Sequence, residues 1–258
     1  MIFLAGTNYK IIEDEILVMT SCITARSAFT IAERYTQTLE SIYSVRKYLP
    51  NVKIVMIEMG KCPIRYNNGI IKVELLEEWK QNLNSLCDYF IDCSSNSDIQ
   101  NLNEIKDDLY WHAIKCIGEC ALMIEVLSHI QAKVVYKLSG RYKLGKSINN
   151  FDLSKINVRF HENNVLIPFE GDLNWKYRYL DNSIYQTTFF SIPGIDINYM
   201  VEVYKMSLKR LLLLHEAKAV YSIEQCLYNF IDKQKVHFVS TLGCTGYLAQ
   251  SKETLYEA

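Results

Sequence analysis

The strongest constraint on the fold is a strand–helix–strand pattern near the start of the chain. Residues 16–22 (ILVMTSC) form a continuous apolar run that ends in small polar residues, and residues 52–58 (VKIVMIE) form a second run. Runs of this kind are typical of strands that are buried on both faces. A helix between two such strands forms the crossover that joins neighbouring strands of a parallel sheet.

The connecting helix is predicted from about Ile31 to Tyr48. Thr30 followed by Glu33 is a capping-box pattern for its start, and Pro50 ends it. Apolar side chains recur at spacings of three and four residues: Ile31, Tyr35, Leu39, Ile42, Val45 and Leu49. This spacing predicts one apolar face that packs on the sheet.

The alternation of strands and helices continues along the chain. Further strands are predicted over residues 87–93, 133–138 and 236–241, and helices over about 110–130, 197–218 and 222–233. Short β-like runs lie between residues 156 and 192. We therefore expect an α/β fold in one domain, with an open, mostly parallel but mixed sheet and flanking helices.

Composition excludes several other classes. The chain has 258 residues, of which 49% are hydrophobic and 22% charged, as in an average soluble domain. The net charge of -1 argues against a nucleic-acid partner, which usually requires a basic surface.

No apolar run approaches the ~20 residues of a membrane span, and the N-terminus lacks the basic region of a signal peptide. The eight cysteines include no CxxC pair, so we expect reduced thiols and no zinc site in a cytoplasmic protein.

Candidate ligand-binding residues follow three of the predicted strands, where open α/β sheets bind their ligands. These segments are Thr24–Ser27, Asp92–Asn96 and Ser139–Tyr142. Arg26 and Arg141 would meet at one sheet edge, and two guanidinium groups in one cleft favour a phosphate or diphosphate. Ser27 and the Gly140 backbone would add hydrogen bonds. Either arginine alone is more often structural, so the pair is better evidence than its members.

The common nucleotide and hydrolase motifs are absent. No GxGxxG follows a strand, no GxxxxGK[ST] is present, and there is no GxSxG. A nicotinamide dehydrogenase, a P-loop enzyme and an α/β-hydrolase are therefore not expected.

Three segments, in order along almost the whole chain, are similar to one family of glycosyltransferases from bacterial polysaccharide loci and large viruses. They are TARSAF with ERYTQTL (from Thr24 to Leu39), KLSGRY (Lys137–Tyr142) and LGCTGYLA (Leu242–Ala249). The resemblance implies a GT-A domain over residues 1–258, with a donor half of about 1–150 and an acceptor half of about 151–258. It also implies sugar transfer from a nucleotide sugar to a glycan or lipid-linked glycan in surface polysaccharide synthesis. Such an enzyme would work in the cytoplasm, with the inner face of the membrane as an alternative place.

The chain departs from the GT-A pattern at the metal site. GT-A enzymes usually carry an Asp-x-Asp motif, whose carboxylates hold a divalent metal on the donor diphosphate. Here the corresponding place holds Ser139, Gly140, Arg141 and Tyr142. We therefore expect a metal-independent site without a cofactor, in which Arg141, with Arg26 or Lys115, offsets the diphosphate charge.

Glu224 is the candidate catalytic base, because it lies in the first turn of a predicted helix capped by Ser222, where many GT-A enzymes place theirs. A glutamate at such a position also simply complements the helix dipole. Asp172 and Asp181 are the alternatives, and retaining chemistry remains open.

The other candidates bind donor or acceptor. Asp92 would contact the donor base or ribose, or else cap the loop that follows. Several of the 18 tyrosines lie in the second half, where Trp175, Tyr185 and neighbouring aromatic residues either stack on an acceptor sugar or form core. His237 is the histidine most suited to the cleft.

Two functions other than sugar transfer fit the same fold. A sugar nucleotidyltransferase would usually show a glycine-rich loop after the first strand, and TARSAF lacks it. A non-catalytic nucleotide- or glycan-binding protein is compatible with the missing Asp-x-Asp.

Overall fold

The computed structural model describes residues 2–4, 9–24, 29–60, 73–98, 111–146, 151–162, 183–217, 222–247 and 254–257. It confirms the strand–helix–strand unit as β3 (Glu15–Ser21), α1 (Ile31–Tyr48) and β4 (Lys53–Glu58). The two strands run parallel, with Ile16 opposite Lys53 and Ser21 opposite Glu58.

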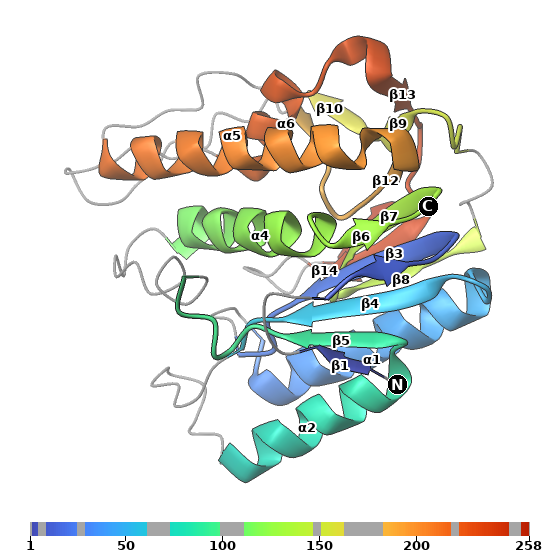
Figure 1. Cartoon of the computed structure of the whole chain (residues 1–258), viewed down its shortest axis with the longest axis vertical. Coiled ribbons are helices and arrows are strands. Elements are labelled where there is room, and N and C mark those ends of the chain that lie inside the picture. Colours follow the sequence, from blue (N-terminus) through green and yellow to red (C-terminus); the bar gives the residue numbers. More distant parts are fainter. Residues whose placement is uncertain are drawn as a thin grey trace.

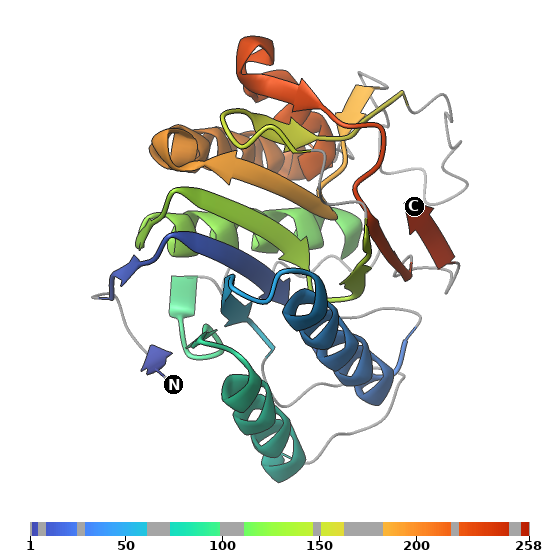
Figure 2. The same cartoon turned by 90° about the vertical axis from the view of Figure 1, so that its right-hand side faces the viewer.

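The unit belongs to an eight-stranded sheet in the order β1-β5-β4-β3-β7-β12-β9-β13. The further strands are β1 (Ile2–Leu4), β5 (Tyr89–Asp92), β7 (Val134–Ser139), β9 (Ile156–Val158), β12 (Phe189–Pro193) and β13 (Val236–Phe238). Within this sheet, the neighbouring strands β1, β5, β4, β3 and β7 run parallel. Strand β12 runs antiparallel to β7 and β9. Figure 2 shows this reversal, because the orange arrow of β12 points opposite to the blue and green arrows of β3 and β7. The predicted mixed, mostly parallel sheet is therefore confirmed.

Helices cover both faces of the sheet (Figure 1). They are α2 (Val73–Leu86), α4 (Trp111–Leu127), α5 (Ile197–Glu216) and α6 (Ile223–Phe230), together with α1. Helices α1 and α2 lie on one face, and α4, with α5 and α6 packed beside it, lies on the other. Within the described residues, no helix is both long and apolar enough to cross a membrane.

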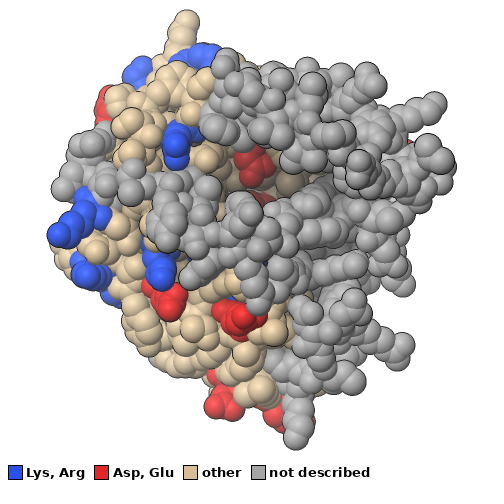
Figure 3. Space-filling model, turned by 180° about the vertical axis from the view of Figure 1, so that it is seen from behind, with Lys and Arg blue, Asp and Glu red and all other residues tan. Residues whose placement is uncertain are grey.

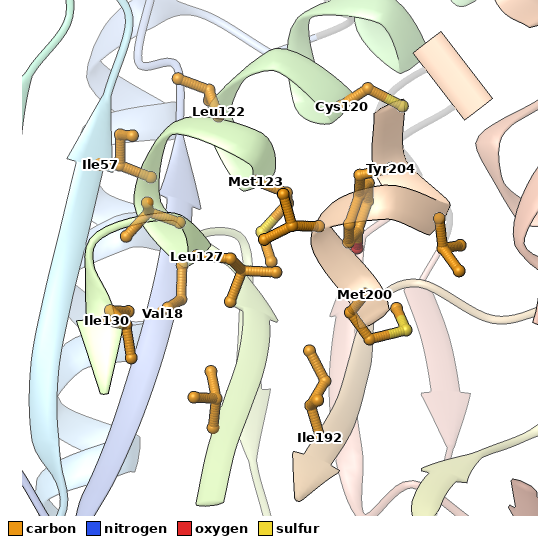
Figure 4. Close-up of a cluster of buried hydrophobic side chains, with 14 of the residues drawn as sticks. Val18, Ile57, Cys120, Leu122, Met123, Leu127, Ile130, Ile192, Met200 and Tyr204 are labelled. Atoms are coloured by element: carbon orange, nitrogen blue, oxygen red, sulfur yellow. The ribbon is translucent and has the colours of Figure 1, made fainter. Parts of the chain in front are cut away.

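The core alternates along each central strand, as the two-residue period of a strand requires. Val18 and Ile57 pack with the helices α4 and α5, whereas Leu17 and Met56 pack toward α1 and α2. Figure 4 shows the first of these two layers, where Leu122, Met123 and Leu127 of α4 lie between the sheet and Met200 and Tyr204 of α5. Because both faces of these strands are buried, their sequences are continuously apolar.

Shorter strands complete the fold. A three-stranded sheet joins β8 (Tyr142–Leu144), β14 (Cys244–Tyr247) and β15 (Thr254–Glu257). Two further pairs are β2 (Ile11–Ile12) with β6 (Ile130–Gln131), and β10 (Phe160–Glu162) with β11 (Ser183–Tyr185). The 3₁₀ helices η2 (Gly194–Asp196) and η3 (Lys233–Lys235) precede α5 and β13.

Two features of the helices differ from the sequence prediction. No element was predicted for residues 73–86, although Leu76, Trp79 and Leu83 of α2 have helical spacing. The capping box of Thr30 and Glu33 is confirmed, and Ile42 and Val45 of the predicted apolar face are buried, but the first half of α1 also buries a polar face. The residues of this face are Arg34, Gln37, Thr38 and Ser41. Its position beside β8 becomes important at the site.

Candidate functional site

The candidate site lies where β3, β4, β5 and β7 end. Since these strands are parallel, their carboxyl ends meet at one edge of the sheet. Strand β12 is antiparallel, so its first residues lie at the same edge, and Phe189 pairs with Leu138 near the end of β7. Residues from both halves of the chain therefore meet here.

A buried lysine organises this meeting point. Lys137, in the middle of the apolar strand β7, has no solvent exposure. Its Nζ donates hydrogen bonds to Ser139 Oγ at 2.8 Å and to the Thr187 carbonyl at 2.5 Å, and it forms an ion pair with Glu119 of α4. A buried ammonium requires such partners because its desolvation is costly. Lys137 thus links the sheet, α4 and the segment before β12.

Glu224 belongs to the same cluster. The Thr187 hydroxyl donates to Glu224 Oε1 at 2.9 Å, so one residue joins Lys137 and Glu224 through its carbonyl and its hydroxyl. Ser222 caps α6 as predicted, accepting from the Gln225 N–H at 3.2 Å. This cap fixes the first turn of the helix and thereby the direction of Glu224.

Two carboxyl groups, those of Glu119 and Glu224, thus lie near each other in this cluster. Burial raises the pKa of Glu224, and the nearby negative charge of Glu119 raises it further. Glu119 keeps 22% of its side-chain surface exposed, and Glu224 is half-buried. Figure 3 shows acidic side chains set back in a hollow on the face opposite to that of Figure 1. A partly accessible carboxyl group with a raised pKa is a stronger base than an ordinary glutamate and is a candidate for proton transfer.

A second buried carboxyl group holds the ends of β3 and β4 together. Glu58 has no solvent exposure, and its Oε1 accepts from the Gly60 N–H at 2.6 Å and the Ile23 N–H at 3.1 Å. Burial raises its pKa, although the hydrogen bonds oppose this effect. Gly60 passes so close that an added Cβ would lie 2.7 Å from Glu58 Oε1.

The turn after β7 carries Gly140 and Arg141 to the end of β3. The Gly140 N–H donates to the Thr20 carbonyl at 2.9 Å, and an added Cβ at Gly140 would lie 3.2 Å from that oxygen. The Arg141 guanidinium lies over the Tyr142 ring at 5.2 Å, and its Nε is buried. Arg141 therefore lies at the predicted edge of the sheet.

Asp92 lies at the end of β5, as expected, but its carboxylate forms an ion pair with a lysine. Lys80 of α2, only 4% exposed, lies 3.1 Å from Asp92 Oδ2, and the Ser94 N–H donates to Oδ1 at 2.8 Å. The second bond is the loop cap considered as an alternative role. Contact with a donor base or ribose stays a prediction.

Tyr142 and Tyr185 are core residues in this structure. Tyr142 is 2% exposed, and an added Cβ at Gly246 would lie 2.2 Å from its ring. Tyr185 of β11 is fully buried beside Tyr228, with ring centroids 5.1 Å apart. His237 is half-buried on β13, opposite Asn157 of β9 at the far edge of the sheet. The cluster around Lys137 includes none of these three, and their ligand roles stay predictions.

Several predicted site residues lie outside the described part. Arg26, Ser27 and Trp175 belong to segments that the structure does not describe, as do Asp172 and Asp181. Lys115 is on the described backbone of α4, but its side chain is not described. The structure thus brings Ser139 and Glu224 together through Lys137, and it places Arg141 at the neighbouring strand end.

The residues after β7 do not fit a divalent metal. A hydroxyl, a glycine and a guanidinium take the place of the hard carboxylate oxygens that such a metal needs. In the described ranges, no group of three or more His, Cys, Asp and Glu side chains is placed to hold a metal ion.

The sequence prediction missed Lys137, Glu119, Thr187 and Arg34 as site residues. A signal existed for Lys137, because a charged residue inside the buried run VVYKLS requires a partner. The signal for Arg34 was weaker, since helical spacing assigned the buried face of α1 to apolar residues. Nothing local marked Glu119 or Thr187, which reach the site through the tertiary fold.

Comparison with known proteins supports the fold. The sequence matches no protein-family model, and no curated protein matches it. The structure is similar to that of galactosyltransferase LgtC in complex with donor and acceptor sugar analogues, with a TM-score of 0.50 and 11% identity over 87% of this chain and 73% of that one. An active-site mutant of LgtC gives a TM-score of 0.51 and 11% identity over 87% and 72%. The predicted GT-A-like α/β fold is therefore confirmed, and at this identity the likeness is one of fold.

Proposed function

We propose that the chain is a glycosyltransferase that moves a sugar from a nucleotide-sugar donor to a glycan or lipid-linked glycan acceptor in surface polysaccharide synthesis. The observation that carries the proposal is the cluster of Glu224, Glu119 and Lys137 at the strand ends of a GT-A-like sheet. Ligands of open α/β sheets bind at this edge. Partly exposed carboxyl groups there are suited to proton transfer.

Glu224 acts as the base in the proposed reaction. Its carboxylate takes the proton of an acceptor hydroxyl while the hydroxyl oxygen bonds to the anomeric carbon and the nucleoside diphosphate leaves. Burial and the charge of Glu119 raise the pKa of Glu224 toward working pH, where a base is most effective. The hydrogen bond from Thr187 fixes the direction of the carboxylate.

Lys137 interacts differently with the two carboxyl groups, which gives them different roles. Its ammonium is paired directly with Glu119 but reaches Glu224 only through Thr187. Glu119 is therefore occupied by the ion pair, and Glu224 is the member that is left to take a proton from the substrate. In this proposal Glu119 is a positioning residue.

The donor diphosphate is proposed to lie at Arg141 without a metal ion. A guanidinium presents a planar set of donors that matches phosphate oxygens. The acceptor would lie toward the second half of the chain, near Trp175, Tyr185 and His237. Cytoplasmic action, including work at the inner membrane face, belongs to the same proposal.

Nucleotide-sugar binding followed by turnover tests the function. Thermal-shift measurements with UDP-, GDP-, CMP- and dTDP-sugars should identify one donor that stabilises the protein. That donor should then be consumed by the wild type and by a Glu202→Gln control, since Glu202 is an exposed residue of α5. Glu224→Gln should bind the donor but transfer its sugar at least about a hundredfold more slowly.

Each other outcome counts against the proposal. Stabilisation by no nucleotide sugar would contradict it directly. Binding without transfer to any glycan acceptor would favour a non-catalytic binding protein. Formation of a nucleotide sugar from a nucleoside triphosphate and a sugar phosphate would favour a nucleotidyltransferase.

A further inference from the structure

The first turns of α1 bury a guanidinium that the proposed chemistry has not yet used. Arg34 is 9% exposed, and its Nη2 donates to the Cys22 carbonyl at the end of β3, at 3.2 Å. Its Nη1 is buried and has no hydrogen-bond partner among the described residues. Native proteins leave few buried polar groups unpaired, so a bound anion is a candidate partner for this nitrogen.

Arg141 lies at the same strand end, in the turn between β7 and β8. The Leu144 N–H donates to Ser44 Oγ at 2.9 Å, which ties β8 to α1, and the Gly140 N–H is bonded to Thr20 of β3. Arg141 lies between these two anchors, and its Nε is also buried without a hydrogen-bond partner in the described ranges. The carboxyl end of β3 thus has two neighbouring guanidinium groups, each with a buried donor that has no hydrogen-bond partner in the described ranges.

The charges of this pair are poorly compensated within the described residues. Burial lowers the pKa of Arg34 to about 10, and the positive charge of Arg141 is the next cause. Glu58 is the nearby acid, but its own pKa is raised by burial, which favours its neutral form. Two neighbouring guanidinium groups repel each other. An anion bound between them offsets this repulsion and accepts hydrogen bonds from their unused donors.

We propose that Arg34 and Arg141 together form a binding site for the diphosphate group of the donor, taking the place of carboxylates and a metal ion. This inference rests on the proposed function and deepens it by naming Arg34, which lies on a helix rather than in a strand-end loop. One planar guanidinium can bind two phosphate oxygens, so two arginines together can hold both phosphates of a diphosphate. An orthophosphate, with one phosphorus, would be held less well than a pyrophosphate.

Pyrophosphate binding tests the pair without requiring turnover. Isothermal titration at constant ionic strength should show inorganic pyrophosphate binding to the wild type more tightly than orthophosphate. Arg34→Gln and Arg141→Gln should each weaken pyrophosphate binding by at least about tenfold, as expected for the loss of a charge-assisted hydrogen bond. The double variant should lose less than the sum of the two single losses, because the residues share one ligand.

Arg46 provides a matched control on the same helix. It lies in the last turn of α1 and is bound to Asp88 at 2.8 Å, at the opposite end of the sheet. Arg46→Gln should lower the melting temperature but leave pyrophosphate affinity unchanged. If Arg34→Gln behaves like this control, with the pyrophosphate-induced rise in melting temperature intact, Arg34 is structural and the proposal is wrong.

Arg34→Lys keeps the test decisive where Arg34→Gln does not fold. A lysine keeps the charge but lacks the planar fork, so pyrophosphate binding several-fold weaker than in the wild type is expected. Affinity equal to that of the wild type would overturn the assignment.

The outcomes also separate the site from the proposed function. If no sugar is transferred but pyrophosphate binding is weakened in both arginine variants, the anion site stands and the transferase proposal fails. If sugar is transferred while the Arg34 variants bind pyrophosphate normally, only the anion site fails.

Discussion

Lys137 and Glu119 form an ion pair that joins the middle of the sheet to helix α4. The ammonium has no contact with solvent, whereas the carboxylate keeps 22% of its side-chain surface exposed. The pair is therefore open on its acidic side only.

Replacing this lysine should cost stability. Lys137→Met leaves Glu119, the Ser139 hydroxyl and the Thr187 carbonyl without their shared donor. We expect a loss of about 3 kcal/mol in the free energy of unfolding, the low end for a broken buried ion pair, because Glu119 retains solvent contact. Urea denaturation measures it. Lys143→Met is the control, since its pair with Glu40 is 41% and 47% exposed and should contribute under about 1 kcal/mol. Equal losses would contradict the role given to Lys137.

Removing the ionisable group at position 224 should abolish catalysis but preserve the fold. Glu224→Gln keeps an oxygen that accepts from Thr187, so the melting temperature should change little, while kcat falls by at least about a hundredfold. Steady-state assays with the identified donor measure this. Turnover within about tenfold of the wild type would exclude Glu224 as the base.

The pH dependence of the wild type should report the raised pKa of Glu224. A base must be deprotonated to work, so kcat/KM should rise with pH and level off above a midpoint higher than the ordinary glutamate value of 4.5. Glu119→Gln removes the negative charge that adds to this shift and should move the midpoint down. A midpoint that stays in place would show that Glu119 does not tune Glu224, whatever its effect on the rate.

Glu58 should make the fold less stable as pH rises. Its pKa is raised by burial, so its contribution is fully present below its unfolded value and is lost as pH rises through the folded value. Glu58→Gln imitates the neutral form, so its stability relative to the wild type should improve between pH 5 and pH 8. Asp88→Asn should show the opposite trend, and at lower pH. Burial pushes the pKa of Asp88 up, but hydrogen bonds from Ile54 and Arg46 outweigh it and lower that pKa below the ordinary value of 3.8. The contribution of Asp88 is therefore present above that value and is lost as pH falls below it. Urea titrations at pH 5 and above would show the trend of Glu58, and titrations below the ordinary aspartate pKa would show that of Asp88.

Chelation should leave the reaction unchanged if guanidinium groups replace the metal. We expect equal turnover with EDTA and with added manganese, measured on the identified donor. Activity that is lost to EDTA and restored by manganese would contradict the metal-independent site.

The fold was more predictable than the site, for a physical reason. Strands β3, β4 and β7 are buried on both faces, so their apolar runs mark them directly in the sequence. The ends of those strands were equally visible, which is how Ser139 and Arg141 were found. Glu119 and Thr187 carry no local signal, because their positions depend on how α4 packs on the sheet and on the direction of β12. The burial of Arg34 was not predicted, since helical periodicity marks apolar residues and this helix also buries polar ones.

The reversed strand β12 also bears on how such a chain can evolve. Thr187 precedes this strand, so a residue of the second half supplies the carbonyl that holds Lys137 of the first half. A recombination event that exchanged either half for that of a distant relative would leave this buried ammonium short of a partner, unless the incoming segment supplied an oxygen at the same point. We therefore expect the two halves to be inherited together, and acceptor specificity to diversify through surface segments rather than by exchange of whole halves.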